Sequence, residues 1–156
     1  MHWQRPDMYA RAVAHAGQVI HGHDGFRLCL IRTAAETEGE LLEMEATYGG
    51  GGQLPPEHFH PGQVERFEVL DGAVRTIIDG VDRRYQAGEV FEVPARTRHQ
   101  MTGDGPARVR WQVTPALRTA EFFERLYGSG TADVGDQGGV AEFLDEFRDE
   151  IQFTAP

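Results

Sequence analysis

The sequence predicts an all-β domain, built as a sandwich or a closed barrel, with helices only toward its C-terminal end. From residue 26 to 114, short apolar or alternating segments follow one another, separated by turns rich in glycine and proline. Asp79-Gly80 lies between two such segments and is a strong signal for a two-residue hairpin turn. After Pro115 the apolar spacing changes to that of amphipathic helices.

The expected strands follow in chain order: 26–33, 40–48, 56–60, 64–70, 73–79, 81–86, 90–93, 98–102 and 107–114. Alternation in the segment 64–70 places Glu65, Phe67 and Val69 on one face of the strand. If that face points inward, Glu65 is a lone carboxylate among apolar neighbours. A buried carboxylate is costly unless it is paired or bound to a metal.

Two helices are expected after the strands. The first covers 120–127, with Thr119 as its cap and Gly128 as its stop, and the second covers 140–151. Their apolar stripes comprise Phe122, Phe123 and Leu126 in the first helix and Val140, Phe143, Leu144, Phe147 and Ile151 in the second. We expect these stripes to pack on the outside of the strand domain or on a second subunit, and the glycine-rich segment 128–139 between the helices to be mobile.

The 156 residues are enough for one domain with a sizeable core. We divide the chain into an N-terminal arm (1–25), a β domain (26–114) and a C-terminal helical extension (115–156). Cys29 is the only cysteine, so no internal disulfide can form, and its apolar surroundings favour a buried structural thiol.

Charge and composition exclude several functions. The net charge is −10 and the basic residues are scattered, which argues against a nucleic-acid partner. All 15 basic residues are arginine, so lysine Schiff-base chemistry is excluded. No apolar run approaches the ~20 residues that cross a bilayer, and the first residues lack a signal-peptide core. We therefore expect a cytoplasmic protein with no membrane partner.

A cluster of potential metal ligands is the strongest functional signal. His58 and His60 are followed by Glu65, and His99 comes after a turn downstream. On a strand, positions i and i+2 share a face about 7 Å apart, so the first two imidazoles would converge. Imidazole and carboxylate together suit Fe, Mn, Ni, Cu or Zn. The alternative is that the histidines are exposed in a loop and the carboxylate is a surface charge. His21-Gly-His23 lacks a following carboxylate and is not expected to bind metal.

The spacing of these residues resembles a known family. Residues 52–72 fit the first cupin motif, G-x5-H-x-H-x4-E-x6-G, at every fixed position. Residues 88–103 resemble the second motif, with Arg96 where the motif has glycine and Gly103 where it has asparagine. The resemblance covers about residues 38–114.

The resemblance implies a single jelly-roll-like β-barrel with one or two C-terminal helices packed outside, and a homodimer. It also implies one divalent transition metal ion per chain (Fe, Mn, Ni, Cu, Co or Zn). The implied metal ligands are His58, His60, Glu65 and His99.

We expect a metal-dependent enzyme acting on a small molecule, and we favour an oxygenase. A non-redox isomerase, cyclase or lyase using the same metal, and a non-catalytic ligand-binding protein, remain the alternatives. Tyr48, Gln53 and Gln112 are the candidate catalytic residues. Further polar groups that could face the substrate or support the ligands are Arg32, Glu43, Glu45, Tyr85, Gln100, Arg110 and Trp111. The glycines 49–52 are expected to form a flexible turn leading into the metal strand, which could gate the barrel mouth.

Overall fold

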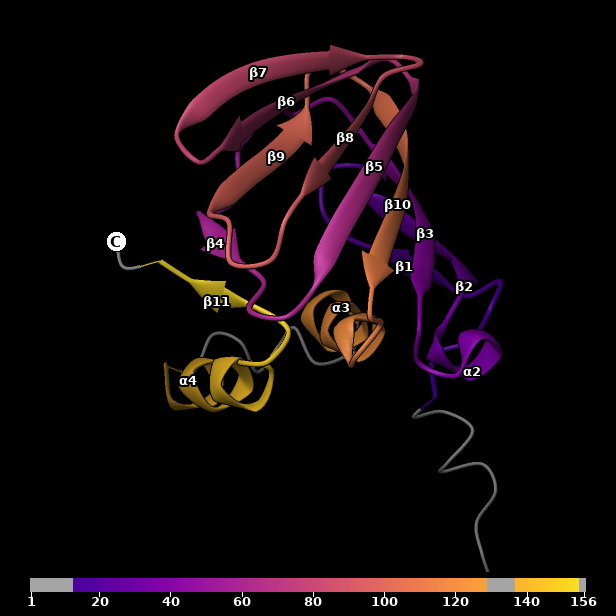
Figure 1. Cartoon of the computed structure of the whole chain (residues 1–156), viewed down its shortest axis with the longest axis vertical. Helices are drawn as coiled ribbons and strands as arrows, with labels where there is room; N and C mark the ends of the chain where they lie inside the picture. Colours follow the sequence, from indigo (N-terminus) through magenta and orange to yellow (C-terminus); the bar gives the residue numbers. More distant parts are fainter. Residues whose placement is uncertain (1–12, 129–136, 155–156) are drawn as a thin grey trace, which may run out of the picture.

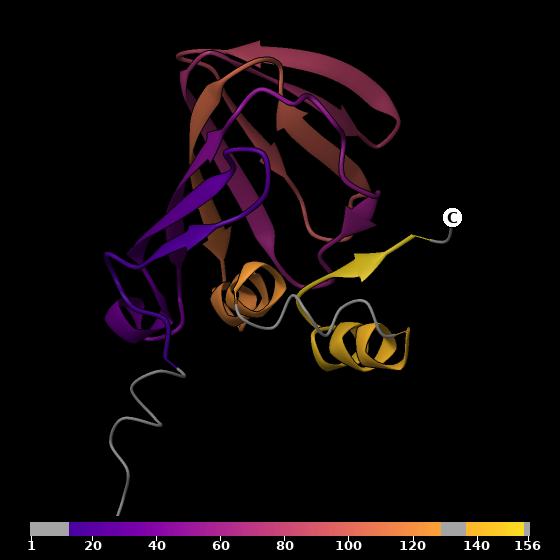
Figure 2. The same ribbon diagram turned by 180° about the vertical axis from the view of Figure 1, so that it is seen from behind.

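Two antiparallel β-sheets pack face to face as a sandwich (Figures 1 and 2). The computed structural model describes residues 13–128 and 137–154. One sheet has six strands in the order β1-β2-β3-β10-β5-β8, and the other has five in the order β11-β4-β9-β6-β7. The prediction of an all-β domain is confirmed.

The strands and helices follow a simple chain order. The strands of the sandwich are β1 (Val19–His21), β2 (Arg27–Arg32), β3 (Leu42–Tyr48), β4 (His58–Phe59), β5 (Val64–Asp71), β6 (Ala73–Ile78), β7 (Val81–Gln86), β8 (Val90–Val93), β9 (His99–Gly103), β10 (Ala107–Thr114) and β11 (Gln152–Phe153). The helices are α2 (Ala34–Thr37), α3 (Thr119–Tyr127) and α4 (Gln137–Glu146).

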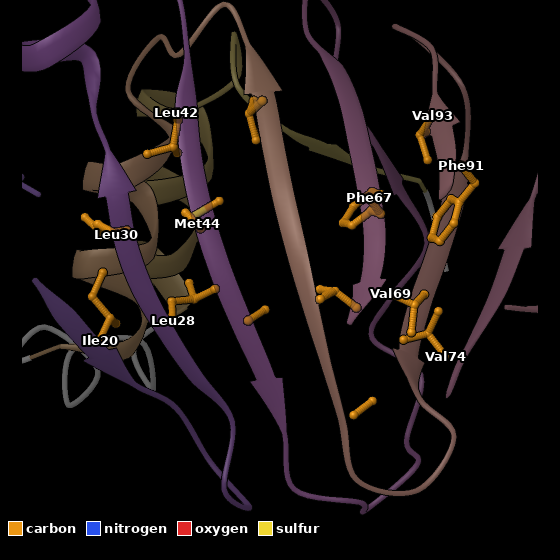
Figure 3. Packing of buried hydrophobic residues seen from close by; sticks show 14 of the residues in the cluster. Ile20, Leu28, Leu30, Leu42, Met44, Phe67, Val69, Val74, Phe91 and Val93 are labelled. Carbon is orange, nitrogen blue, oxygen red and sulfur yellow. The ribbon is translucent and has the colours of Figure 1, made fainter. Parts of the chain in front are cut away.

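Alternating residues of the six-stranded sheet supply most of the core. Leu28 and Leu30 of β2, Met44 of β3 and Phe67 of β5 are at most 2% exposed. Figure 3 shows these side chains lying on one face of the six-stranded sheet. The buried face of β5 also carries Glu65, as its alternation predicts.

The hairpin predicted at Asp79-Gly80 is present. Both residues have positive φ, 51° and 78°, and Ile78 pairs with Val81 across the turn. A two-residue turn of this kind matches the right-handed twist of the strands that it joins. Gly72, between β5 and β6, is required for a different reason: a Cβ there would lie 2.2 Å from the carbonyl oxygen of Pro106.

Three elements were not expected from the sequence. Val19–His21, within the stretch assigned to the arm, pairs with β2 as β1, and α2 follows β2 with a capping box on Thr33. β11 pairs with β4 at the edge of the five-stranded sheet. The proposed boundary between arm and barrel remains a prediction, and residues 1–12 lie outside the described part of the chain.

The C-terminal helices differ from the prediction at three of their ends. Arg118, not Thr119, is the N-cap of α3, and Gly128 ends that helix as expected. α4 begins at Gln137 and stops at Glu146 instead of continuing to Ile151. A turn follows, in which the backbone N–H of Glu150 donates to the carbonyl of Phe147, and it returns the chain to pair with β4. Most of the segment that we expected to be mobile lies outside the described residues.

Helix α3 lies at one end of the sandwich, next to the ends of β5 and β10, and α4 lies beyond it (Figures 1 and 2). Phe122 of α3 packs against Phe143 and Phe147, so the two apolar stripes meet each other. In the described part of the chain, no helix is both long enough and apolar enough to span a membrane.

Candidate metal centre

Three histidines, carried by β9, by β4 and by the residue that follows β4, converge inside the sandwich. His58 on β4 is the direct register partner of His99 on β9, and His60 follows immediately after β4. One nitrogen of each ring can be chosen so that all three lie within 4.8 Å of one another. His60 and His99 are buried, at 7% and 4% exposed. The three residues therefore form a group that could hold one metal ion.

The backbone holds all three imidazoles in the same way. Each Nδ1 lies within hydrogen-bond distance of a carbonyl oxygen: His58 of Pro56 (3.0 Å), His60 of Glu150 (2.7 Å) and His99 of Thr97 (2.8 Å). A carbonyl oxygen can only accept, so each Nδ1 must carry a proton. In the neutral ring this leaves a lone pair on Nε2. Such a hydrogen bond on the far nitrogen is the usual support of a metal-binding histidine.

Glu65 brings a carboxylate to the same point. Its Oε1 lies 3.0 Å from the Nε2 of both His60 and His99. Its Oε2 accepts a hydrogen bond of 2.8 Å from the indole N–H of Trp111. The side chain is 1% exposed, so it depends on these partners for stabilisation.

The charges of the site are strongly coupled. Burial acts to raise the pKa of Glu65, but His60 and His99 outweigh it and hold that pKa below its usual value. Burial acts to lower the pKa of His60, and the neighbouring carboxylate outweighs it and raises the pKa. For His58, burial prevails and, with the nearby His99, lowers the pKa to about 4. His58 therefore remains neutral, as a metal ligand must be.

The geometry fits a divalent ion. Nε2 of His60 and Oε1 of Glu65 are buried and have no hydrogen-bond partner among the described residues. Two acceptors in this position need a cation or a proton between them. Ligand atoms about 2.1 Å from one ion, and at right angles to each other, lie about 3 Å apart, as these atoms do. Both nitrogen and oxygen donors are present, which suits a transition metal.

A cavity of about 510 Å³ opens onto the histidines. Two of the three candidate catalytic residues, Tyr48 and Gln53, line it. Gln112 does not; it lies beyond the described lining and donates a hydrogen bond of 2.8 Å to Glu43. The reason is strand alternation, since the neighbouring Trp111 faces the cavity.

The other polar candidates also divide into residues that line the cavity and residues that do not. Trp111 lies in the cavity and contacts Glu65. The remaining ones do not line it: Arg32 and Arg110 pair with Glu43, Glu45 pairs with Arg108, Gln100 donates to the carbonyl of Pro55, and Tyr85 stacks on Phe91. The sequence does not separate these groups, because it shows which residues share a face but not which face is inward.

The C-terminal extension contributes residues to the site that sequence reasoning missed. Phe122, Phe123 and Leu126 of α3 line the cavity, although we expected their stripe to pack on the outside or on a second subunit. The carbonyl of Glu150 supports His60, and β11 adds a strand beside His58. The apolar stripe is visible in the sequence, but nothing there indicates the pairing of residues 152–153 with β4.

Comparisons with known proteins agree with the fold. Residues 44–114 match the family model described as "Cupin domain". An RmlC-like cupin from Shewanella frigidimarina superposes with a TM-score of 0.57 at 18% identity, covering 67% of this chain and 88% of the other. KdgF from Halomonas sp. gives 0.55 at 18% identity, with 63% and 86% covered.

A third structure is that of a predicted oxalate decarboxylase from Thermotoga maritima. Its TM-score is 0.54 at 14% identity, with 66% of this chain and 89% of that protein covered. Comparison with curated proteins gives no match. At these identities the similar structures establish the fold alone.

Proposed function

Because this chain contains a small cupin-superfamily domain, we propose that it is a metal-dependent enzyme that acts on a small molecule inside the sandwich. The proposed metal ligands are His58, His60, Glu65 and His99. The observation that carries the proposal is the convergence of three oriented imidazoles with a buried carboxylate whose Oε1 lacks a hydrogen-bond partner in the described chain.

An ion held by three imidazoles and one carboxylate keeps one or two open positions, where it would supply Lewis-acid chemistry and, for a redox-active metal, electron transfer. The protein's own groups hold these ligands in position. Three backbone carbonyls fix the imidazoles, and Trp111 fixes Glu65. Aromatic side chains, among them Phe67 and Trp111, line the cavity beside the cluster.

Within this class we favour an oxygenase. A histidine-rich site with open positions suits Fe(II) or Ni(II) and O₂. A specific observation keeps a non-redox isomerase, cyclase or lyase as the second candidate. Tyr48 lines the cavity beside the histidines, and burial, together with nearby Tyr127 and Glu65, raises the pKa of its hydroxyl above the usual value, so this group acts there as a neutral hydrogen-bond donor. A neutral hydroxyl in this position can donate a hydrogen bond to the oxygen of an enolate.

The first experiment is elemental analysis of the purified protein and two variants. We expect about one divalent transition-metal ion per wild-type chain, loss of that ion in His60→Ala, and retention in His23→Ala. His23 is a matched control because it lines the same cavity but is outside the histidine group. Equal, non-zero metal contents in all three proteins would refute the assignment, and no metal in any of them would favour a ligand-binding protein.

The second experiment separates the two reaction classes. Once a substrate is found, turnover is measured in air and under nitrogen on the metal-loaded protein. An oxygenase stops without O₂ and consumes it in proportion to product. Unchanged turnover under nitrogen would eliminate the oxygenase and leave the proton-transfer reaction. A homodimer and a cytoplasmic location remain predictions beside this proposal.

A further inference from the structure

The cavity above the histidines has a continuous aromatic wall. Six lining side chains form it: Phe67 on β5, Trp111 on β10, Phe123 and Tyr127 on α3, Phe26 before β2 and Tyr48 at the end of β3. We refer to these six residues as the aromatic wall.

Each member of the wall contacts the next. Ring centroids are 5.3 Å apart for Phe67 and Trp111, 5.3 Å for Trp111 and Phe123, and 6.2 Å for Phe123 and Tyr127. The series continues from Tyr127 to Phe26 at 5.5 Å and from Phe26 to Tyr48 at 5.3 Å. A surface of adjoining rings favours a ligand that presents a flat, polarisable face.

The wall is accompanied by little charge. None of the described residues that line the cavity is an arginine, and the chain has no lysine. The lining carboxylates are Glu65, beside the histidines, and Asp24, which is exposed. An anionic ligand would therefore meet no guanidinium or ammonium group on this wall, and the charge of a divalent ion at the cluster would already be offset in part by the Glu65 carboxylate. A cationic ligand would meet one carboxylate outside the metal cluster, that of Asp24, which is exposed to water.

Polar groups for orientation are few and well placed. No described residue accepts a hydrogen bond from the Tyr48 hydroxyl, and burial raises the pKa of this group above its usual value. Tyr127 lies close enough to contribute to the raised pKa of Tyr48, and burial also raises the pKa of the Tyr127 hydroxyl. Two phenol groups on an otherwise apolar wall can donate to a neutral oxygen or nitrogen of a ligand.

We propose that the cavity takes a neutral aromatic small molecule, which lays its ring on the aromatic wall and directs an oxygen-bearing end to the histidine cluster. This inference rests on the proposed metal-dependent function and specifies its substrate class. The cavity volume of about 510 Å³ is in the ~300–1,000 Å³ range of small-molecule sites.

The test is calorimetric titration of the metal-loaded protein with four molecules of similar size: naphthol, naphthoate, naphthylmethylammonium and decahydronaphthol. We expect naphthol to bind at least about tenfold more tightly than each of the other three, since they add a charge or lose the flat ring. Tighter binding of naphthoate or of the ammonium compound, or equal binding of decahydronaphthol, would overturn the proposal.

Two variants connect the binding to the wall. Phe123→Leu is expected to weaken naphthol binding about threefold to tenfold. Tyr85→Leu is the matched control, because Tyr85 stacks on Phe91 outside the lining, and it should leave binding unchanged. Equal effects of both variants would overturn the proposal.

Metal content measured on the same samples separates the two hypotheses. Stoichiometric metal without any preference for naphthol would refute the substrate class and leave the metal site intact. Selective naphthol binding by a protein that holds no metal would support the aromatic wall and refute the metal-dependent function.

Discussion

Nδ1 of His60 lies 2.7 Å from the backbone carbonyl oxygen of Glu150, a residue 90 positions later in the chain. The side chain of Glu150 also accepts a hydrogen bond from the backbone N–H of Arg118, at the start of α3. A single residue thus connects a candidate metal ligand with the helix that lines the cavity. The C-terminal extension belongs to the site in structural terms, although it lies outside the matched cupin segment.

The first prediction concerns this connection. Deleting residues 147–156 removes the carbonyl that holds His60, and metal affinity should fall about 10–100-fold, as for other supporting groups of metal ligands. Chelator competition measures the affinity, and circular dichroism checks that the sandwich is retained. Glu150→Gln is the control, because it keeps the backbone carbonyl and should bind metal normally. A folded, truncated protein with wild-type affinity would contradict the role of Glu150.

The second prediction concerns Trp111. Replacing it with phenylalanine removes the indole N–H and leaves a buried carboxylate oxygen of Glu65 without its 2.8 Å partner. We expect metal affinity to fall about tenfold or more and the protein to lose about 1–3 kcal/mol of unfolding free energy. Both are measurable, by competition with a chelator and by urea unfolding.

The control for that variant is Phe67→Leu. Phe67 stacks on Trp111 and lines the same cavity, but it donates no hydrogen bond. It should lower stability through lost packing while metal affinity stays near wild type. If the two variants reduced metal affinity equally, packing rather than the hydrogen bond would explain the effect.

The expected strands of the sandwich and the closeness of His58 and His60 follow from local sequence patterns, whereas His99 joined them only through the resemblance to the second cupin motif. Period-two alternation placed Glu65 on the buried face of β5, and the spacing of His58 and His60 put both near one point. The partners that orient them are not local. Glu150 reaches His60 only because β11 pairs with β4, and Trp111 reaches Glu65 across two adjacent strands.

Strand alternation alone also does not show which of the candidate catalytic residues line the cavity. Alternation shows that Trp111 and Gln112 point to opposite faces, but only the packing of α3 and the second sheet decides which face is the cavity. The same limit applies to α3 itself, since an apolar stripe fits an outer surface or a subunit contact as well as a cavity.

The third prediction concerns Glu43, which is buried beside Gln112 and Arg32. Burial acts to raise its pKa, but these hydrogen bonds and the charges of Arg32 and Arg110 outweigh it and lower the pKa below 4.5. A carboxylate whose pKa is depressed on folding stabilises the protein above its unfolded pKa, and this stabilisation is lost as the pH falls through the folded value. Glu43→Gln should therefore cost about 1 kcal/mol at pH 7, and less below about pH 4.5.

The measurement is urea unfolding of the metal-free protein at pH 7 and pH 4. Glu92→Gln, at an exposed position of β8, is the control and should have no more than a small effect at either pH. A Glu43→Gln deficit that stayed constant or grew in acid would show that its charge contributes nothing. Gln112→Ala should likewise reduce stability but leave metal content unchanged, because Gln112 contacts Glu43 and not the cavity.

The last prediction concerns Arg96, which stands where the second cupin motif has glycine. Its φ is 64°, in the left-handed region, and its N–H donates to the carbonyl of His60 at 2.8 Å. The strain costs an arginine about 1–3 kcal/mol, and glycine avoids it while losing about 0.5–1 kcal/mol more chain entropy. Arg96→Gly should therefore raise the melting temperature by a few degrees, with metal content unchanged. Arg98→Gly is the control, because Arg98 is an exposed arginine without positive φ and its replacement removes the same charge. This variant should lower the melting temperature. Equal destabilisation by both variants would show that the turn at Arg96 is unstrained.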